Sequence, residues 1–334
     1  MRSSRLLDVT DGPDTPIPVY VLTGFLGSGK TTLLAKLLAR PEFADTAVLI
    51  NEFGEVGLDH LIAREVSEDV VLLDSGCLCC SAGDDLASTL LELYHLRHQA
   101  DAPAFNRVVI ETSGLADPGP VLTLVMTDRR LNTIFEAGPV LTVIDAINGA
   151  ENITRFPEAE HQLGLADTVV ISKTDLVPPD LVTMLEQQIK AINAHAVLVD
   201  SETTRDPFRY FDGPRALPDT PVPHGHDEHP HHDHSGDIGS FVVQIEDDVD
   251  WPRFVTWLEL LLSARGKSIL RVKGLLAVHG EHRPLVLQAV QTMVYPPQFL
   301  PRWPADVRAS QIVFIARDLT AAAIETSLRK HVLA

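Results

Sequence analysis

Cysteine is scarce in this chain, and its scarcity narrows the possible chemistry. Only three cysteines occur among 334 residues, and all of them fall in the segment Cys77-Leu78-Cys79-Cys80. The chain therefore has no distant cysteine for a structural disulfide, and a bridge between the adjacent Cys79 and Cys80 would be strained. This pattern argues against a disulfide-stapled secreted domain, and a reducing cytoplasm is the expected compartment.

The chain also has few basic residues relative to its acidic ones, and it has no long hydrophobic run. The 27 lysines and arginines stand against 46 aspartates and glutamates, which gives a formal net charge of −19. This balance argues against general binding to nucleic acid or to anionic membranes. No run approaches the roughly 18 apolar residues of a membrane-spanning helix, and residues 1–16 lack the apolar core expected of a secretory signal. We expect neither nucleic-acid nor membrane partners.

Short apolar runs alternate with amphipathic segments through residues 17–200. Most runs are rich in valine and isoleucine with little polar alternation, as expected for parallel strands covered on both faces. Segments 86–96 and 181–192 have helical periodicity. The pattern predicts an α/β fold with a doubly wound, mostly parallel sheet. The expected strands are 19–22, 47–50, 70–73, 108–110, 140–144, 169–171 and 197–199.

A different pattern follows a segment rich in proline, aspartate and histidine. Four strand-like runs and two helical segments indicate a small α+β domain. On the first of these helices, Phe254, Trp257, Leu258 and Leu261 share one face, which is expected to lie in a core. The expected strands are 241–245, 268–278, 285–294 and 312–316, and the expected helices are 251–264 and 319–332.

These patterns divide the chain into four parts. We expect a disordered tail over residues 1–16 and the large α/β domain over 17–201. A His-rich linker is expected over 202–239, and the small C-terminal α+β domain over 240–334.

A phosphate-binding loop follows the first expected strand. The segment Gly24-Phe25-Leu26-Gly27-Ser28-Gly29-Lys30-Thr31 matches G-x-x-x-x-G-K-[ST] and precedes an expected helix over 32–39. Backbone N–H groups of such a loop form a nest for phosphate oxygens, and the helix N-terminus adds partial positive charge. Lys30 would reach the β and γ phosphates, and the Thr31 hydroxyl would bind Mg²⁺. The motif predicts a P-loop NTPase fold. The predicted nucleotide contacts here are Gly24, Gly27, Ser28, Gly29, Lys30, Thr31 and Thr32.

An acidic residue ends another buried strand. The run Val108-Val109-Ile110 leads into Glu111, where a Walker B acid would hold a Mg²⁺-bound water. Glu111-Thr112-Ser113-Gly114 then has the form E-x-x-G, in which the glycine N–H could sense the γ-phosphate. Lys30 and Glu111 are therefore the predicted catalytic residues, and Gly114 a nucleotide contact. The alternative for Glu111 is an ordinary acid at the end of a strand.

A polar turn with a base-reading pattern follows the strand at 169–171. Ser172-Lys173-Thr174-Asp175 resembles the N-K-x-D motif of GTPases, with serine in place of asparagine. Asp175 could accept hydrogen bonds from the guanine N1–H and 2-amino group, a pattern that adenine lacks. The stem of Lys173 could pack on the base or on the phosphate loop. The alternative is a strand-to-helix turn capped by Asp175.

The cysteine cluster is a candidate metal site. Cys77, Cys79 and Cys80 can supply up to three thiolates, which favour Zn²⁺ or Cu(I) over Mg²⁺. Zinc prefers four tetrahedral ligands. The fourth could be Glu55, Glu52, water or a residue of a client protein. An open position suits a carrier, since a closed four-thiolate site would release metal slowly.

A second group of metal-binding side chains lies in the linker. Six of the chain's fourteen histidines fall within eleven residues there. Such a tract predicts a weak, multi-site metal collector, although a solvated linker without function is the alternative. The six are His224, His226, His229, His231, His232 and His234.

Taken together, the motifs resemble those of the CobW-type P-loop GTPase metallochaperone family. The resemblance implies a slow GTPase that uses GTP and Mg²⁺, binds zinc or a related divalent metal, and delivers it to a client metalloprotein. It also implies that a loop around Glu55 could act as a switch. The resemblance rests on Gly24 to Thr32, Asn51-Glu52-Phe53-Gly54-Glu55, Cys77 to Cys80, Glu111-Thr112-Ser113-Gly114-Leu115-Ala116-Asp117-Pro118, Ser172 to Asp175 and Leu270-Arg271-Val272-Lys273-Gly274.

Several alternatives stay open at this point. A relative of the same family could insert cobalt, nickel or iron rather than zinc. The chain could also be a metal-storage or metal-sensing protein with vestigial GTPase activity, which the histidine tract would suit. A phosphotransferase would use the same phosphate loop, but the segment 172–175 argues against it. A homo-oligomer is compatible with the sequence, and the client is not identified by it.

Overall fold

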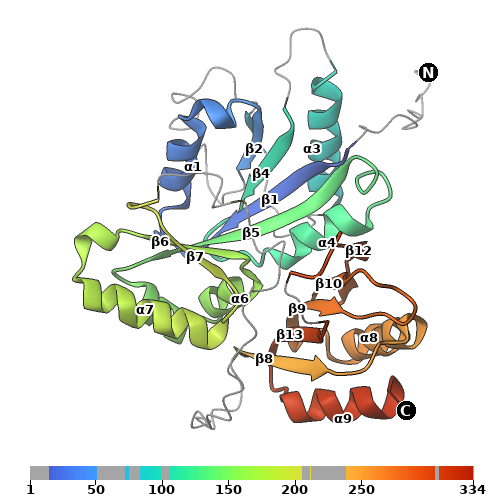
Figure 1. The fold of residues 1–334 in the computed structure, drawn as a ribbon. Helices are drawn as coiled ribbons and strands as arrows, with labels where there is room; N and C mark the ends of the chain where they lie inside the picture. The colour runs from blue at the N-terminus through green and yellow to red at the C-terminus, as the bar shows by residue number, and fades with distance from the viewer. Residues whose placement is uncertain are drawn as a thin grey trace. The chain divides into compact units, whose positions relative to one another are not determined.

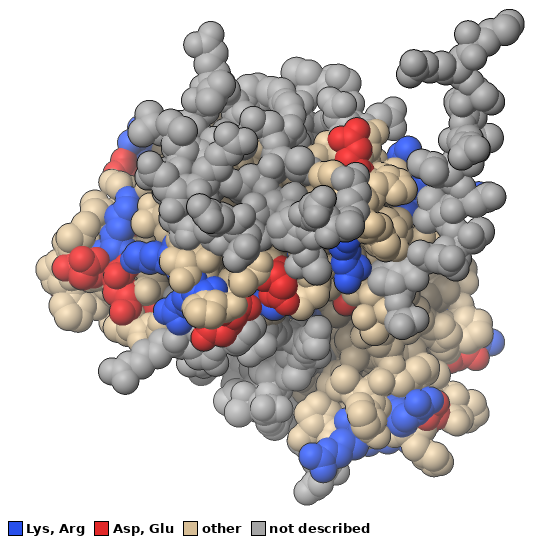
Figure 2. Space-filling view, turned by 90° about the horizontal axis from the view of Figure 1, so that it is seen from above, with Lys and Arg blue, Asp and Glu red and all other residues tan. Residues whose placement is uncertain are grey.

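The computed structural model describes residues 15–50, 72–74, 83–98, 105–204, 211, 238–304 and 308–333. These residues fall into two compact units, which are divided between Val140 and Leu141. Within the described residues, no helix is long and apolar enough to cross a membrane. Charges of both signs lie side by side on the described part of the face in Figure 2.

The first unit contains a parallel sheet with helices beside it (Figure 1). Its strands run in the order β3-β2-β4-β1. Leu22 of β1 lies opposite Glu111 of β4, so the phosphate loop and the predicted Walker B acid follow adjacent strand ends. The elements are β1 (Ile17–Thr23), α1 (Lys30–Leu38), the 3₁₀ helix η1 (Pro41–Phe43), β2 (Thr46–Ile50), β3 (Leu72–Asp74), α3 (Gly83–Leu96), β4 (Arg107–Glu111), α4 (Gly119–Thr127) and the start of β5 (Phe135–Asp145).

The second unit begins with the rest of β5 and continues the α/β alternation. Strands β5, β6 and β7 are parallel neighbours in that order. A core of buried aliphatic side chains, including Val169, Leu185 and Ile189, lies between the strands and α7. The elements are α5 (Gly149–Arg155), α6 (Pro157–Leu165), β6 (Thr168–Ser172), the 3₁₀ helix η2 (Thr174–Leu176), α7 (Pro179–Ile192) and β7 (Val197–Asp200).

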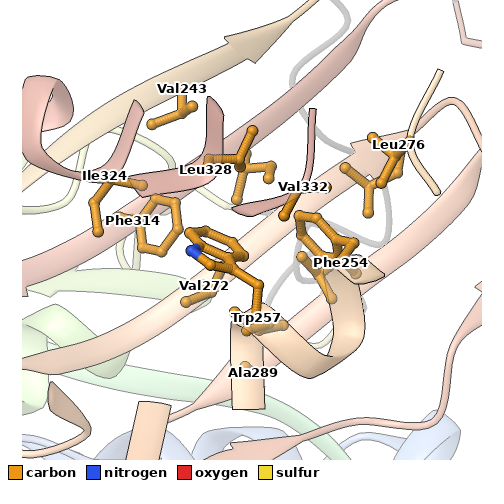
Figure 3. Packing of buried hydrophobic residues seen from close by; sticks show 14 of the residues in the cluster. Val243, Phe254, Trp257, Val272, Leu276, Ala289, Phe314, Ile324, Leu328 and Val332 are labelled. Carbon is orange, nitrogen blue, oxygen red and sulfur yellow. The ribbon is translucent and has the colours of Figure 1, made fainter. Parts of the chain in front are cut away.

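An antiparallel sheet and two helices complete the second unit. Its strands run in the order β11-β10-β9-β13-β8, with β12 beside β10. Phe254 and Trp257 of α8 pack with Leu328 of α9 in the core of this region (Figure 3), which confirms the predicted core stripe. The elements are β8 (Ile238–Ile245), α8 (Trp251–Arg265), β9 (Ile269–Leu276), β10 (Leu285–Val290), β11 (Met293–Val294), β12 (Gln298–Phe299), β13 (Ser310–Arg317) and α9 (Ala321–His331).

The predicted fold class is confirmed, and the predicted elements need two corrections. The apolar run 285–294 forms two strands, β10 and β11, rather than one. They pair as a tight hairpin in which Val290 lies opposite Met293. Gln291 takes the left-handed conformation that the turn needs, with φ of 51°. The strand expected over 268–278 ends at Leu276, and Val278 forms an isolated bridge with Val249. Positions 70 and 71 of another expected strand lie outside the described residues.

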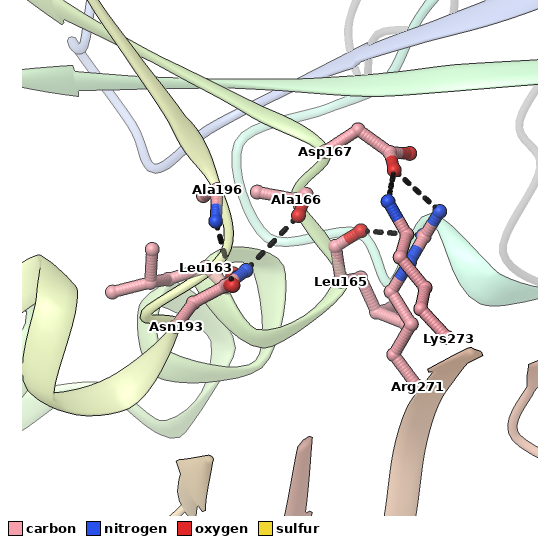
Figure 4. Close-up of polar contacts among 8 residues, drawn as sticks. All are labelled: Leu163, Leu165, Ala166, Asp167, Asn193, Ala196, Arg271 and Lys273. Carbon is pink, nitrogen blue, oxygen red and sulfur yellow. Dashed lines mark hydrogen bonds and ion pairs between the residues drawn. The ribbon is translucent and has the colours of Figure 1, made fainter. Parts of the chain in front are cut away.

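Strand β9 is buried along its whole length because its two faces have different neighbours. Val272 and Leu276 face the core beneath α8 and α9. On the other face, Arg271 and Lys273 reach Asp167, the residue before β6 (Figure 4). The Arg271 Nη2 donates to Asp167 Oδ1 over 2.6 Å, and Lys273 Nζ donates to the same oxygen.

This ion cluster is deeply buried. The side chains of Arg271 and Asp167 are only 4% and 5% exposed. Arg271 Nη1 also donates to the Leu165 carbonyl over 2.9 Å. A buried cluster of this kind depends on having both signs of charge present, since each ion has lost its water. The cluster joins β9 to the turn between α6 and β6.

Candidate functional site

The phosphate loop has the backbone that an anion nest requires. Gly24, Gly27 and Gly29 have φ angles of 142°, 72° and 96°, which residues with a Cβ adopt only with strain. The Lys30 side chain is buried, and its Nζ donates to the Gly24 carbonyl over 2.9 Å. The Lys30 side chain therefore folds over the loop that precedes it. Its ammonium group lies where phosphate oxygens would bind.

A hydroxyl and a carboxylate meet beside this loop. Thr31 Oγ1 donates to Glu111 Oε1 over 2.7 Å, and Glu111 is fully buried. Thr112 Oγ1 donates to Thr23 Oγ1 over 2.9 Å, which ties the end of β4 to the end of β1. Hard oxygen donors of this kind suit Mg²⁺. Thr31 and Glu111 therefore fit the ion that the sequence predicts.

Gly114 lies against the phosphate loop. A Cβ at this position would stand 2.6 Å from Leu26 Cδ2 and 2.8 Å from the Leu26 backbone nitrogen. Such distances are too short for any side chain, so only glycine permits the approach. The E-x-x-G segment thus passes close enough to the loop for the predicted sensing of phosphate, which stays a prediction.

The segment that is predicted to read the base, Ser172 to Asp175, belongs to the second unit and is held by contacts of Ser172 and Lys173. Lys173 takes the left-handed conformation with φ of 58°, and its Nζ lies 3.9 Å from Asp145 Oδ1. The Ala146 backbone N–H donates to the Ser172 carbonyl over 2.8 Å. Asp175 is exposed, within the turn Thr174–Leu176. The segment is therefore pinned by its backbone and by Lys173, while the Asp175 carboxylate remains accessible.

Two aspartates that support this segment were not predicted. Asp145 is 2% exposed, and its Oδ1 accepts from the Asn148 backbone N–H over 2.8 Å. Asp200 Oδ1 accepts from Thr174 Oγ1 over 2.9 Å. Each aspartate is the last residue of an apolar strand, β5 or β7. That is the same signal that pointed to Glu111, so the sequence did contain the information.

The predicted zinc ligands and the histidine tract lie outside the described residues. This holds for Glu52, Glu55, the three cysteines and the six histidines of the linker tract. Among the residues that the structure does describe, no group of three or more His, Cys, Asp or Glu side chains could hold a metal ion.

Comparison with known proteins places the chain in a family. The model of the CobW/HypB/UreG nucleotide-binding domain matches residues 18–200, which is more than half of the chain. The chain belongs to this family. The CobW C-terminal domain matches residues 238–332. These two matches account for the α/β part and the antiparallel part of this CobW-type chain, and they confirm the resemblance drawn from its motifs.

Curated relatives of this CobW-type chain span nearly its whole length. It is 33% identical over 306 residues to the zinc chaperone YjiA of Escherichia coli, covering 91% of this chain and 95% of that protein. It is 30% identical over 353 residues to the zinc chaperone CobW of Pseudomonas aeruginosa, covering 94% and 91%. The crystal structure of the Zn(II)-bound YjiA GTPase from E. coli has a TM-score of 0.71 and 28% identity, covering 95% of this chain and 99% of that one.

The accessible Asp175 leads to a prediction about base specificity for this CobW-type chain. Replacing Asp175 with asparagine exchanges one carboxylate oxygen for an N–H donor, which faces the guanine 2-amino group unfavourably. We expect GTP affinity to fall about 100-fold, because one of the two charge-assisted hydrogen bonds is replaced by a contact between two donors and the other loses its charge. Affinity for xanthosine triphosphate should rise. Competition binding against labelled GDP would measure both. The exposed Asp180 on α7 supplies the control, Asp180→Asn, and an unchanged guanine preference in Asp175→Asn would refute the assignment.

Proposed function

We propose that the protein is a GTP-hydrolysing metallochaperone that binds zinc and transfers it to a client metalloprotein. The observation that carries the proposal is the cluster in which Lys30 and Thr31 begin α1 and Glu111 ends β4. Relatives named zinc chaperones, similar over more than nine tenths of the chain, support the metal part.

The residues of the first unit have distinct roles in this proposal. Lys30 and the loop N–H groups bind and orient the β and γ phosphates, so that the reacting phosphoryl group is fixed. Thr31 and Glu111 would hold Mg²⁺, whose chemistry is to neutralise charge that develops on the phosphate oxygens. Gly114 reports through its N–H whether the γ-phosphate is present.

The cysteine triplet would hold the cargo. Cys77, Cys79 and Cys80 give three thiolates, with Glu55 as the first candidate for the fourth ligand and Glu52 as the second. The histidine tract from His224 to His234 would collect metal weakly. Metal binding displaces thiol protons, so the affinity should fall in acid.

The proposal includes the organisation and setting of the chain. The GTPase domain would span 17–201 and the C-terminal domain 240–334, with 202–239 as the linker and 1–16 as a tail. The protein would work in the cytoplasm, with a client metalloprotein and a divalent metal as its partners. It would need neither nucleic acid nor membrane, and a homo-oligomer is compatible with the scheme.

The test compares zinc affinity between nucleotide states. We expect zinc affinity, measured by competition with a chromophoric chelator, to differ at least about tenfold between a non-hydrolysable GTP analogue and GDP. A carrier can be driven only by such a difference. Cys79→Ser with Cys80→Ser should lose the tight site, whereas His279→Ala with His282→Ala should retain it. Equal affinities in the two states would reject the carrier cycle, and tight binding by the double cysteine variant would reject the site.

A metal-storage or metal-sensing protein with vestigial GTPase activity is the second candidate. The histidine tract favours it, because storage benefits from many weak ligands. GTP turnover separates the two functions: a carrier should hydrolyse GTP faster when metal and client are present, and a storage protein should not respond.

A further inference from the structure

A groove lies between the two helices of the C-terminal region. It has a volume of about 720 Å³ and lies between α8 and α9. Trp257 contributes to its floor, and the indole Nε1 donates to Ser327 Oγ on α9 over 3.0 Å. Figure 3 shows Trp257 beside Phe254 and Leu328, so this floor belongs to the packed core. The Trp257 side chain at the bottom of the groove is therefore held in place by core packing and by its hydrogen bond.

Helix α8 has apolar residues on two faces. Phe254, Leu258 and Leu262 are buried against the sheet. Leu260, Leu261 and Ala264 line the groove, and of these Leu261 also packs against the core. Leu260 is 66% exposed, which is the highest value among the large hydrophobic residues that the structure describes. A leucine of this kind, beside an apolar hollow, is typical of a protein-binding surface.

The rim of the groove is basic, although the protein as a whole is strongly acidic. Arg253, Arg265 and His331 line it, and no aspartate or glutamate does so among the described residues. Arg329 and Lys330 precede His331 in the last turn of α9. This local charge, on a chain with a net charge of −19, indicates a partner with carboxylates around an apolar centre.

The geometry suits one kind of partner best. A groove between two helices accepts the apolar stripe of a third helix, read by side chains at i, i+3, i+4 and i+7. An anionic membrane is disfavoured, because the surface is hollow and the protein's net charge repels it. A second copy of this chain is also disfavoured, because each copy carries a net charge of −19 and the two would repel each other.

We propose that the groove between α8 and α9 binds an acidic amphipathic helix of a partner protein. The leucine-type side chains of that helix would enter beside Leu260 and Leu261, above Trp257. Its glutamates or aspartates would face Arg265 and His331. This proposal does not depend on GTP hydrolysis or on the cysteine site, since all its residues lie in the C-terminal region.

The test uses the full chain and two matched peptides. The first is a fluorescein-labelled, alanine-based helical peptide with leucines at i, i+3, i+4 and i+7 and glutamates on both flanks. The second has lysines in place of the glutamates. Fluorescence anisotropy should show binding of the glutamate peptide at least about tenfold tighter than that of the lysine peptide. No binding of the glutamate peptide, or equal binding of both, would overturn the proposal.

Variants separate this surface from others. Leu260→Ser should weaken binding of the glutamate peptide about tenfold, the scale expected for one buried leucine side chain. Met184→Ser is the control, because Met184 is similarly exposed, at 62%, but lies on α7. Arg265→Glu with His331→Glu should reverse the preference toward the lysine peptide, a result that misfolding cannot produce. Thermal unfolding would verify that each variant is folded.

Two other occupants are outcomes of the same experiments. If sedimentation shows a dimer that Leu260→Ser converts to monomer, a second copy occupies the groove and the proposal is wrong. If vesicles of phosphatidylserine and phosphatidylcholine bind the protein and Leu260→Ser abolishes this, the groove faces lipid and the proposal is also wrong. Binding of the glutamate peptide with neither of these outcomes supports it.

Discussion

Replacing Lys30 with alanine should weaken the binding of Mg-GTP by at least about 100-fold. The Lys30 Nζ already donates to the Gly24 carbonyl and is buried at the mouth of the loop, so little ordering is needed when phosphate arrives. Two charge-assisted hydrogen bonds to phosphate would be lost, each worth about 1.5–3 kcal/mol. Every 1.4 kcal/mol is about tenfold in affinity. Isothermal titration with a non-hydrolysable analogue would measure the loss.

The control for this experiment lies on the same helix. Lys36 is exposed in the last turn of α1, so Lys36→Ala removes the same charge at a distance from the loop. We expect it to bind Mg-GTP as the unmodified protein does. Equal affinity of Lys30→Ala and Lys36→Ala would contradict the assignment of the loop. A fall in melting temperature would reveal instead that the Lys30 contacts stabilise the loop itself.

Replacing Asp167 with alanine should lower the free energy of unfolding by about 3–5 kcal/mol. The variant leaves Arg271 and Lys273 buried without the carboxylate that both contact. Urea unfolding would measure the change. Glu151→Ala is the control, because the Glu151–Arg155 pair on α5 is more than 60% exposed at both side chains, and such pairs contribute about 0–1 kcal/mol. A loss of unfolding free energy no larger than that of the control would show that the cluster does not stabilise the fold as expected.

The same cluster has a signature in the pH dependence of stability. Burial, with the help of Arg271, lowers the pKa of Lys273 to about 8 against the opposing effect of Asp167. In the unfolded chain the pKa returns to its ordinary value of 10.5. Between these values the unfolded chain binds more protons, so the Lys273 contribution to stability should rise with pH. Lys273→Met should lose this rise, and an identical pH slope in both proteins would contradict it.

The strands of the α/β part were predictable because their residues are distinctive. Runs such as Val108-Val109-Ile110 have no polar alternation, and burial on both faces leaves few other possibilities. The helices α5 and α6 were not predicted. The segment Pro157–Leu165 has three acidic or histidine side chains among its first five residues and no regular apolar stripe. Its glycine and both of its leucines are buried by tertiary contacts, which local periodicity does not report.

The site was predictable where chemistry and strand ends coincide. Lys30, Thr31 and Glu111 follow a known pattern, and β1 and β4 bring them together. The turn at Gln291 was missed, because neither Gln291 nor Thr292 is a residue that usually marks a hairpin. Asp167 was missed for another reason. Its partners lie in a different part of the chain, and a single aspartate before a strand gives no sign of two buried cations.

The contact between Asp167 and Arg271 joins positions that are 104 residues apart. During synthesis the ribosome releases Asp167 and α6 well before β9 exists. Until β9 is made, Asp167 lacks its two cations, and Gly164 lacks the close neighbour Leu270 that a Cβ there would strike at 2.5 Å. Pairings over such distances form late, since chain closure must occur first. Nascent chains that stop before β9 should therefore be recognised by chaperones and proteases as unfinished, even with the nucleotide motifs fully translated.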